Sequence, residues 1–348
     1  APALRVLEPG LATTLQDLGR GGFQRFGVPP SGALDPGALR LANALVGAQE
    51  AQAGLEIRFL GPVLAAEDGP VRLALAGAAA SMLRMGIDGT ETPIPDGRSL
   101  TLAPGERLRI GALSGSSTAY LALSPGFDVA AALGSRATLA RAGLGGFAGR
   151  GLAAGDRLAL LPGTPEGPEL ALPPADAADR AAPGSPSTVR VVLGPQDDLF
   201  TEDAVRAFLT ADWRITKDAD RMGLRLEGPR LSHRAGADIV SDGIETGAVQ
   251  VPGTGQPILL LADRQTSGGY AKIAAAIRAD LPLLGRLAPS AVLRFVAVSP
   301  VEGAAALRAA ESSLRRRIAG IAPVGTGPSI DLEALYRENL ITGQVEGD

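Results

Sequence analysis

The chain has 348 residues, 45% of them hydrophobic and 20% charged, with a formal net charge of −4, which is the composition of a folded protein long enough for two domains. Only 3% of the residues are aromatic and none is cysteine, which argues against nucleic-acid binding and excludes disulfides and thiolate chemistry. No apolar run approaches the roughly 20 residues of a membrane span and no signal pattern opens the chain, so we expect a soluble cytoplasmic protein without membrane contact.

The first polar segment of interest runs from Thr13 to Phe23. Gln16, Asp17 and Arg20 supply an amide, a carboxylate and a guanidinium, and the glycines that follow let the backbone approach a ligand. The alternative interpretation is a hairpin that contains an internal Asp17–Arg20 salt bridge.

A helix is expected directly after this segment. Asp35 is placed to cap it, Pro36 is favoured at its first position, and Gly47 is a typical stop. The turn 27–35 brings the chain to the start of this helix, where a carboxylate could be met because helix N-termini favour anions.

Most of the remaining local signals indicate strands. Short aliphatic runs separated by glycine and proline favour a mainly β fold of the barrel or sandwich type. The clearest runs are Val71–Ala76, Leu108–Leu113, Ala119–Leu123, Val189–Leu193 and Val292–Val298. Further helices are expected over Glu202–Leu209, Ala304–Ile318 and Leu332–Asn339.

A stretch rich in proline, alanine and glycine divides the chain. We interpret residues 162–187 as a linker between a first domain, 1–161, and a second, 188–300, with a helical extension over 301–348. Segments 104–114 and 289–299 share the pattern Pro-x-x-x-Leu-Arg-φ-x-Ala-φ-Ser, and a second pattern recurs upstream of each, which indicates a duplicated domain.

The second half contains further strand ends loaded with polar groups. Gln196 follows the strand at 189–193, Arg221 lies in Asp220–Gly223, and Gln250 lies in Ser241–Pro252. Asp220-Arg221 and Asp242-Gly243 are equally typical of ordinary turns. The single histidine, His233, is expected in an exposed surface turn, which argues against a Ser-His-Asp hydrolase.

The strongest site signal is the segment Ile258–Tyr270. The apolar run 258–262 is followed by five polar residues, Asp263, Arg264, Gln265, Thr266 and Ser267, and then by a double glycine, so a rigid strand would present a polar cluster. The alternative is a strand that ends in a solvated turn. The next segment, 271–277, is helical by its alanine content, although pairing in a sheet could make it a strand.

These segments share amides, arginines and carboxylates, without cysteine and with no histidine among them. Such a set suits the binding of a planar amide, ureido or carboxylate group and the stabilisation of negative charge on an oxygen. Covalent catalysis and a metal site are not expected. Neither lysine, Lys217 or Lys272, follows the glycine-rich loop of a nucleotide-binding P-loop, and neither follows the methionine typical of biotin attachment.

Seven motifs in order resemble the family of biotin-dependent carboxyltransferase domains, which includes allophanate hydrolase subunit 2 and the C subunits of ATP-dependent 5-oxoprolinases. The motifs are Thr13–Arg20, Gly27–Asp35, Leu133–Arg136, Gly194–Gln196, Asp220–Gly223, Val249–Pro252 and Asp263–Thr266 with Gly268–Tyr270. The resemblance implies two tandem cyclophilin-like β-barrel domains with a few short helices, and it implies that 271–277 is a strand.

The resemblance also implies a function. We expect a subunit of a multi-subunit ATP-dependent 5-oxoprolinase that opens 5-oxoproline to glutamate together with subunits A and B, with ATP used by the complex and no activity of this chain alone. The alternatives are a carboxyltransferase subunit that acts on urea or a related amide with carboxybiotin from another protein, and a regulatory partner that binds a companion subunit without catalysis.

Site residues follow from the same motifs. We expect Asp17, Asp263 and Arg264 to act in catalysis, with a carboxylate as proton acceptor and the guanidinium on a substrate oxygen. The expected substrate-binding residues are Gln16, Arg20, Gln196, Arg221, Gln250, Gln265, Thr266 and Tyr270.

Overall fold

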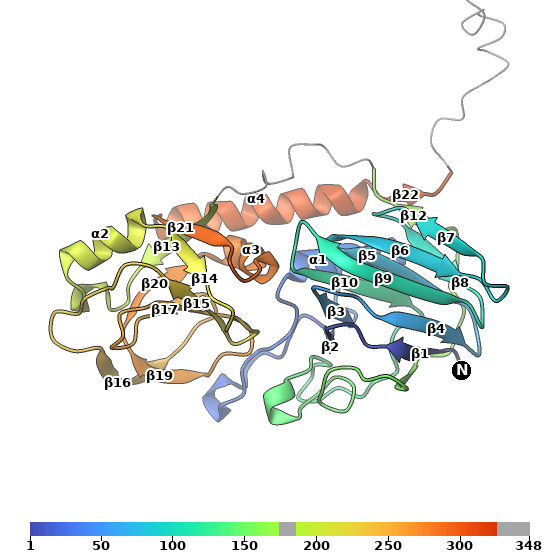
Figure 1. Ribbon diagram of the computed structural model, residues 1–348, viewed down its shortest axis with the longest axis horizontal. Coiled ribbons are helices and arrows are strands. Elements are labelled where there is room, and N and C mark those ends of the chain that lie inside the picture. Colours follow the sequence, from blue (N-terminus) through green and yellow to red (C-terminus); the bar gives the residue numbers. More distant parts are fainter. Residues whose placement is uncertain (174–185, 326–348) are drawn as a thin grey trace, which may run out of the picture.

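The computed structural model describes residues 1–173 and 186–325. Two β domains lie side by side, and one long helix runs along both of them (Figure 1). The prediction of a mainly β fold with few helices is confirmed. The helix expected over residues 332–339 and residues 174–185 of the expected linker lie outside the described residues, and residues 170–171 of that linker form a short strand.

The first domain is built from two antiparallel sheets around one apolar core. One sheet has the spatial order β11 (Arg157–Ala159), β1 (Ala3–Glu8), β4 (Val63–Glu67), β9 (Arg107–Ser114), β6 (Ala79–Met85) and β7 (Glu91–Ile94). The other has the order β2 (Ala12–Gln16), β3 (Gly54–Arg58), β10 (Thr118–Ser124), β5 (Val71–Ala76) and β8 (Ser99–Leu102). Side chains of period two point into the space between the sheets.

Helix α1 (Pro36–Leu45) covers the outer face of the second sheet. Asp35 caps it as predicted, because its Oδ1 accepts a hydrogen bond of 3.0 Å from the Ala38 amide. Leucines of the helix pack on small residues of β5, Ala74 and Ala76, while Leu73 and Leu75 of the same strand face the core. This double coverage explains why β5 is buried along its whole length.

The second domain is a closed barrel of seven strands. Their order around the barrel is β13 (Ser187–Leu193), β20 (Lys272–Ala276), β17 (Ala248–Gln250), β18 (Ile258–Leu260), β15 (Gly223–Glu227), β14 (Trp213–Ile215) and β21 (Val292–Ala297). Helix α2 (Glu202–Thr210) packs on β21, where the Phe208 ring stacks on Phe295 with centroids 4.3 Å apart. A separate two-stranded antiparallel sheet pairs β16 (Asp238–Gly243) with β19 (Ser267–Tyr270).

The segment over residues 271–277 is a strand, so the helix that its alanine content favours is wrong. β20 pairs with β13 on one side and with β17 on the other. Ala274 and Ala276 fill the barrel core, where two neighbouring strands leave room for small side chains. Tertiary pairing therefore overrides the helical propensity of alanine here.

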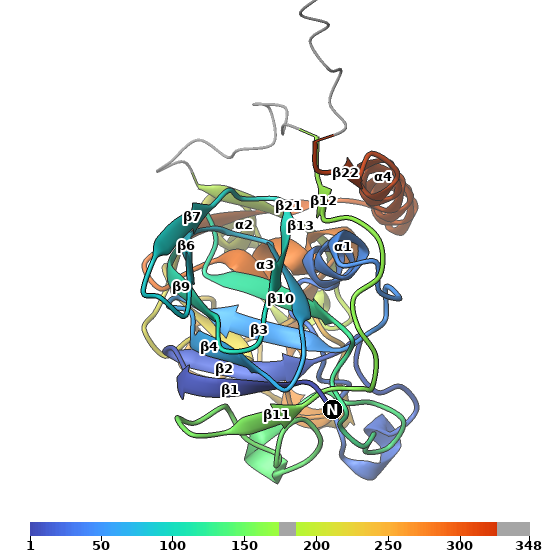
Figure 2. The same ribbon diagram turned by 90° about the vertical axis from the view of Figure 1, so that its right-hand side faces the viewer.

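Helix α4 (Pro300–Ala319) links the domains. It begins earlier than the predicted residue 304 because Ser299 and Glu302 form a reciprocal capping box. Near its start, a Cβ added at Gly303 would lie only 3.0 Å from Ile277 of the second domain. Near its end, Leu314 and Ile318 pack on the apolar cluster of α1, and Figure 2 shows α4 beside α1.

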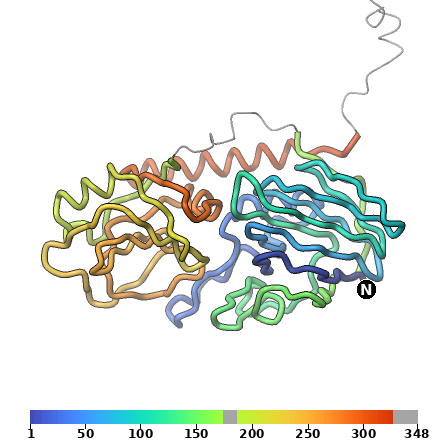
Figure 3. The backbone as a smooth tube through the Cα atoms, in the orientation of Figure 1, coloured from blue at the N-terminus to red at the C-terminus, as the bar shows by residue number. Residues whose placement is uncertain are grey.

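After α4 the chain stays with the first domain, since β22 (Ala322–Pro323) pairs with β12 (Leu170–Ala171). The remaining short elements are α3 (Leu281–Arg286), η1 (Gln24–Phe26), η2 (Ala140–Ala142), η4 (Asp197–Leu199) and η5 (Arg278–Asp280). None of the helices within 1–173 and 186–325 has the length and hydropathy of a membrane span. The backbone trace shows that the first and last parts of the described chain both lie on the first domain (Figure 3).

The two copies of the predicted repeat both contain strands, β9 and β21. Their pairing differs, because β9 lies antiparallel to both neighbours whereas β21 runs parallel to β13 and antiparallel to β14. The duplication stays a prediction.

Candidate functional site

The two strongest polar segments meet at the boundary between the domains. The Ser31 amide donates to the Ala262 carbonyl over 3.1 Å, so the turn before α1 lies directly against the end of β18. Segment 17–33 of the first domain runs along this boundary (Figure 1). The sequence alone indicated a pair of segments, and the chain brings them into contact.

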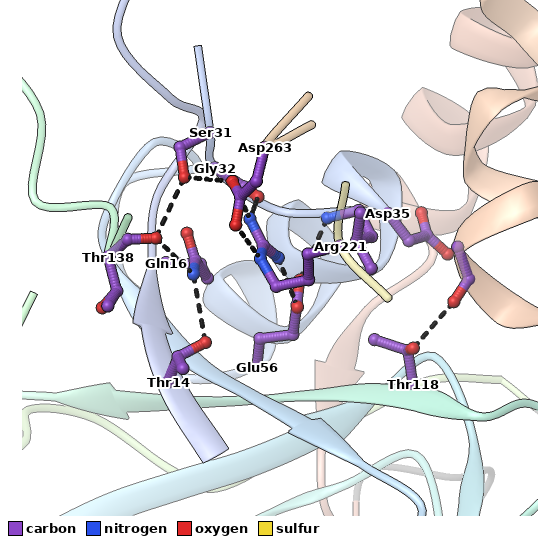
Figure 4. Close-up of polar contacts among 12 residues, drawn as sticks. Thr14, Gln16, Ser31, Gly32, Asp35, Glu56, Thr118, Thr138, Arg221 and Asp263 are labelled. Carbon is purple, nitrogen blue, oxygen red and sulfur yellow. Dashed lines mark hydrogen bonds and ion pairs between the residues drawn. The ribbon is translucent and has the colours of Figure 1, made fainter. Parts of the chain in front are cut away.

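Ser31 joins the two segments through its side chain. Its hydroxyl lies 2.6 Å from Asp263 Oδ1 and 2.9 Å from the Thr138 carbonyl (Figure 4). The same carbonyl accepts a hydrogen bond of 3.1 Å from Gln16 Nε2. Gln16 and Asp263 are therefore held in one buried cluster by groups from four separate parts of the chain.

Arg20 is almost fully buried in this region, with 2% of its surface exposed. Its Nη2 donates to the Ala137 carbonyl, whereas its Nε and Nη1 have no hydrogen-bond partner among the described residues. Burial lowers the pKa of Arg20, and the charges of Asp17 and Asp263 oppose that shift. The guanidinium thus holds hydrogen-bond donors that an oxygen-rich ligand would satisfy.

The alternative Asp17–Arg20 salt bridge does not form. The Asp17 carboxylate accepts hydrogen bonds from the Gly19 amide at 2.8 Å and from the Ser135 hydroxyl at 2.7 Å on one oxygen, and from the Arg136 amide at 2.6 Å on the other. These contacts fix the loop around residue 135 to the end of β2. The expected role of Asp17 in catalysis stays a prediction.

Arg221 binds both domains at once. Its Nε donates to Asp263 Oδ2 over 2.8 Å, its Nη1 to Glu56 Oε1 over 2.5 Å and its Nη2 to the Gly32 carbonyl over 2.7 Å (Figure 4). The charges of Glu56 and Asp263 raise the pKa of Arg221 against the effect of burial. These contacts hold the two domains together at the site, and the expected role of Arg221 in substrate binding stays a prediction.

Glu56 was missed by sequence reasoning. It is 1% exposed, and its Oε2 accepts from the Tyr120 hydroxyl at 2.7 Å and from the Leu34 amide at 3.0 Å. Burial and the charge of Glu56 raise the pKa of Tyr120 well above its usual value, so the phenol stays a donor. The alternation in β3 predicts only that Glu56 points away from the Leu55 and Ile57 face.

Arg264 lies next to Asp263 in sequence but points into the second domain. It is 1% exposed, and its Nε and Nη2 both donate to the Ile244 carbonyl, at 3.1 and 2.9 Å. Its Nη1 has no partner within the described residues. Burial lowers the pKa of Arg264, and the charge of Glu245 opposes this.

Two glutamines extend this part of the site. Gln265 Nε2 donates to Gln250 Oε1 over 3.3 Å, and Gln250 Nε2 is buried without a partner among the described residues. A Cβ added at Gly268 would lie 2.9 Å from Gln250 Nε2 and 2.9 Å from the Ile244 side chain. The glycine is therefore required by the close approach of its backbone to these groups.

Gln196 lies farther along the same barrel, where its Oε1 accepts from the Lys272 amide over 3.1 Å. Lys272 itself is 3% exposed, and its Nζ lies 2.9 Å from Asp242 Oδ2 of strand β16. No motif singled out this lysine, and the one available signal was a charged residue inside an alanine-rich segment.

The last two predicted residues contribute less. The Thr266 carbonyl accepts from the Ile244 amide over 3.0 Å, which is a backbone role. Tyr270 ends β19 and is 42% exposed, in contrast to the buried side chains of Gln250 and Arg264. The expected roles of Thr266 and Tyr270 in binding stay predictions.

His233 is not in an exposed turn, so that expectation is wrong. Its ring is half-buried against Phe200, with centroids 4.6 Å apart, and its Nε2 lies 3.0 Å from the Val251 carbonyl. An isolated backbone bridge between Phe200 and His233 explains the burial. The histidine packs the wall of the second domain.

The buried polar atoms without partners concentrate in the predicted site. Five of the nine such atoms in the described residues belong to Gln16, Arg20, Gln250 and Arg264. Four of those five atoms are N–H donors on arginine or glutamine. Because unpaired buried donors are costly, their concentration indicates a ligand rich in acceptor oxygens.

Comparison with known proteins supports one family. The family model for the carboxyltransferase domain, subdomain A and B, matches residues 26–297. The chain is 34% identical to the 5-oxoprolinase C subunit of Escherichia coli K12, over 90% of this chain and 96% of that protein. It is 32% identical to the urea amidolyase of Lachancea kluyveri, over 85% of this chain.

A solved structure agrees with this fold. The crystal structure of the K. lactis urea amidolyase superposes with a TM-score of 0.80 at 29% identity and covers 90% of this chain. The matched region spans only 20% of that protein and 17% of the L. kluyveri enzyme. The large urea amidolyases thus contain this unit as one part among others.

Proposed function

Because this chain belongs to the carboxyltransferase domain, subdomain A and B, family, we propose that it is a subunit of an ATP-dependent 5-oxoprolinase. The similarity to the C subunit of the E. coli 5-oxoprolinase extends over nearly the whole of that protein. The similarity to urea amidolyase covers 17% of the relative. The separate-subunit relative is therefore the better guide.

The carrying observation is the set of buried donors without partners at the domain boundary. Arg20, Arg264 and Gln250 offer N–H groups in a region of low exposure. Donors in a water-poor region stabilise negative charge on an oxygen far more than they do in water. In the reaction proposed below, such charge lies on the oxygens of the transferred phosphoryl group and of the substrate carboxylate.

The proposed reaction proceeds without a covalent enzyme intermediate. The γ-phosphoryl group passes from ATP to the lactam oxygen, and ADP leaves. Water then adds to the ring carbon, the C–N bond breaks as the nitrogen takes a proton, and an acyl phosphate forms. A second water releases inorganic phosphate and leaves glutamate. In this scheme Arg264, Gln265 and Arg20 hold the substrate oxygens.

The other subunits complete the site in this proposal. The two carboxylates expected to act in catalysis, Asp17 and Asp263, are engaged by hydrogen bonds within the chain. A base that activates water therefore comes from a partner, in the first instance the B component of the complex. We expect no turnover from this chain alone.

Co-expression with the other two 5-oxoprolinase subunits, A and B, tests the proposal. The assembled complex should form glutamate and ADP in equal amounts from 5-oxoproline and ATP, and Arg264→Ala should reduce that rate at least a hundredfold with assembly intact. A complex that assembles without hydrolysing 5-oxoproline contradicts the function. Unchanged turnover in Arg264→Ala contradicts the site and favours a binding-only role.

Carboxyl transfer to urea is the second candidate, favoured by the TM-score of 0.80 to the urea amidolyase structure. In that case the chain would accept a carboxyl group from carboxybiotin on another protein. Supply of a biotinylated carrier, biotin carboxylase, bicarbonate and ATP would then yield carboxylated urea, and removal of the carrier would abolish the product. The 5-oxoprolinase proposal expects no dependence on biotin.

A further inference from the structure

The outer face of the second barrel carries a buried lysine for which the reaction scheme has no use. Lys272 occupies the first position of β20, and its neighbours Ala271 and Ile273 point into the barrel core. A β-bulge in the pairing with β17 separates Lys272 from Ala274, so Lys272 shares the outer face with its partner Gln250 while Ala274 faces the core. Lys272 is nevertheless 3% exposed, so its side chain is covered from outside.

The two-stranded sheet of β16 and β19 covers this side chain. Asp242 of β16 pairs in register with Gly268 of β19, and Asp242 Oδ2 lies 2.9 Å from Lys272 Nζ. Gln250 of β17 is the cross-strand partner of Lys272 and lies on the same outer face. Lys272 and Gln250 thus both lie between the barrel and the two-stranded sheet, and Gln250 lies beside Gly268.

Arg264 is connected to Gly268 through Ile244. Its guanidinium is tied to the Ile244 carbonyl, and both the Ile244 side chain and Gln250 Nε2 lie within 2.9 Å of a Cβ added at Gly268. Gln265 closes the group through its bond to Gln250. The backbone of Gly268 therefore lies against Gln250, Gln265 and Ile244. Lys272 is connected to it through Asp242, and Arg264 through Ile244.

The two carboxylates that oppose the buried cations of this group are both exposed. Asp242, which is hydrogen-bonded to Lys272, has a side chain that is 54% exposed, and the charge of the exposed Glu245 acts on Arg264. Gln250 Nε2 and Arg264 Nη1 add buried donors without partners in the described part of the chain. Since buried cations are stable only when paired, the group is suited to an anion with at least two oxygens.

We propose that Lys272, together with Gln250 and Arg264, binds the carboxylate of the substrate. The proposal rests on the proposed 5-oxoprolinase function, because 5-oxoproline carries one carboxylate besides its uncharged lactam. Lys272 then determines the choice between a carboxylated lactam and an uncharged one. Asp242 is the counterion of Lys272 in the absence of substrate, and its exposed side chain can turn to solvent when the substrate carboxylate binds.

The test uses the assembled complex and two probes, 5-oxoproline and its uncharged carboxamide. Dissociation constants are measured by calorimetry and turnover by glutamate formation. Lys272→Met should weaken the binding of 5-oxoproline by about tenfold to a hundredfold and that of the carboxamide by less than about threefold. The loss should appear in KM, with kcat changed little, and Lys272→Arg should recover part of it.

Asp242→Asn is the matched control, because it breaks the same ion pair and leaves the cation. If Lys272 only holds the two-stranded sheet on the barrel, both variants weaken the binding of both probes alike, and the proposal is overturned. If Lys272 contacts a transferred phosphoryl group, kcat falls for Lys272→Met while the preference for the carboxylate stays, which also overturns it. Wild-type complex that neither binds nor hydrolyses 5-oxoproline removes the proposed function and this subsite together.

A second variant covers the case in which Lys272→Met does not assemble. Gln250→Glu has nearly the same shape and places a negative charge in the subsite. It should reverse the preference for 5-oxoproline over the carboxamide by at least about tenfold. An unchanged preference in an assembled Gln250→Glu complex overturns the proposal.

Discussion

Glu56 and Arg221 meet across the domain boundary, with Glu56 Oε1 2.5 Å from Arg221 Nη1. Glu56 lies in the middle of strand β3 in a first-domain sheet, and Arg221 lies in the turn before β15 of the second domain. Arg221 also donates to Asp263, so one buried chain of hydrogen bonds runs from Tyr120 through Glu56 and Arg221 to the candidate site. Domain arrangement and site geometry therefore depend on the same contacts.

Glu56→Gln should destabilise the chain by about 3–5 kcal/mol. The substitution keeps the shape, but it leaves the Arg221 charge short of a partner and turns an amide nitrogen toward other donors. Urea unfolding gives the change in free energy of unfolding. Glu67→Gln is the control, because Glu67 pairs with Arg5 and Arg157 at the surface, and its loss should cost under about 1 kcal/mol. Equal effects of the two variants would contradict the prediction.

Much of the fold was accessible from local patterns. The cap at Asp35, the aliphatic strands and the ordered motifs each depend on neighbouring residues or on a resemblance, and the structure contains all of them. Segment 271–277 needed the resemblance, because an isolated alanine-rich stretch gives no information on the strands β13 and β17 that pair with it.

The site was only partly accessible, for a related reason. Alternation in β3 shows that Glu56 points away from a core, and the core positions of Ala271 and Ile273 indicate the same for Lys272, which normally means solvent. Glu56 is instead covered by the second domain, and Lys272 by the two-stranded sheet of β16 and β19. Coverage of an outer face by a distant segment leaves no trace in the local pattern, so both residues were missed.

Arg20→Met should leave the chain as stable as the wild type, or up to about 1–2 kcal/mol more stable, while turnover of the complex falls at least a hundredfold. Arg20 is buried with two nitrogens unpaired in the described residues, and an apolar side chain removes that desolvation cost. Urea unfolding of the chain and glutamate formation by the complex measure the two effects.

Arg72→Met is the control for that pair of measurements. Arg72 is also buried, but its guanidinium donates to the Glu166 and Gly167 carbonyls, each at 2.7 Å, and to the Thr101 hydroxyl. Its loss strands these acceptors and should destabilise the chain by about 1–3 kcal/mol. If Arg20→Met destabilises the chain as much as Arg72→Met, the unpaired donors of Arg20 do not carry the cost assigned to them.

Gly268→Ala should lower kcat/KM for 5-oxoproline by at least about tenfold with little effect on assembly. The added Cβ would lie 2.9 Å from Gln250 Nε2, so the amide must move out of its position in the site. Gly243→Ala in the paired strand β16 is the control, since a Cβ there meets no atom within 4 Å. Similar losses in both variants would mean that the backbone of the sheet formed by β16 and β19, and not the position of the Gln250 amide, limits activity.

The contact between α1 and α4 should weaken in acid. Hydrogen bonds from Arg40 at 2.7 and 2.8 Å, with a further contribution from Arg315, lower the pKa of Glu311 from 4.5 to about 2. A carboxyl whose pKa is depressed in the folded state adds stability above its unfolded pKa and loses it as the pH falls through the folded value. The contribution should therefore be complete above about pH 4.5 and fade toward about pH 2.

Glu311→Gln measures this contribution directly. At about pH 6 it should lower the free energy of unfolding by roughly 0.5–1 kcal/mol, because the pair is partly exposed and screened. At about pH 3 the difference from wild type should shrink to less than half of that value. In an Arg40→Gln background the substitution should have little effect at either pH, since the main partner of Glu311 is gone. A difference that is independent of pH would show that α4 is held on α1 by the packing of Leu314 and Ile318 and not by this ion pair.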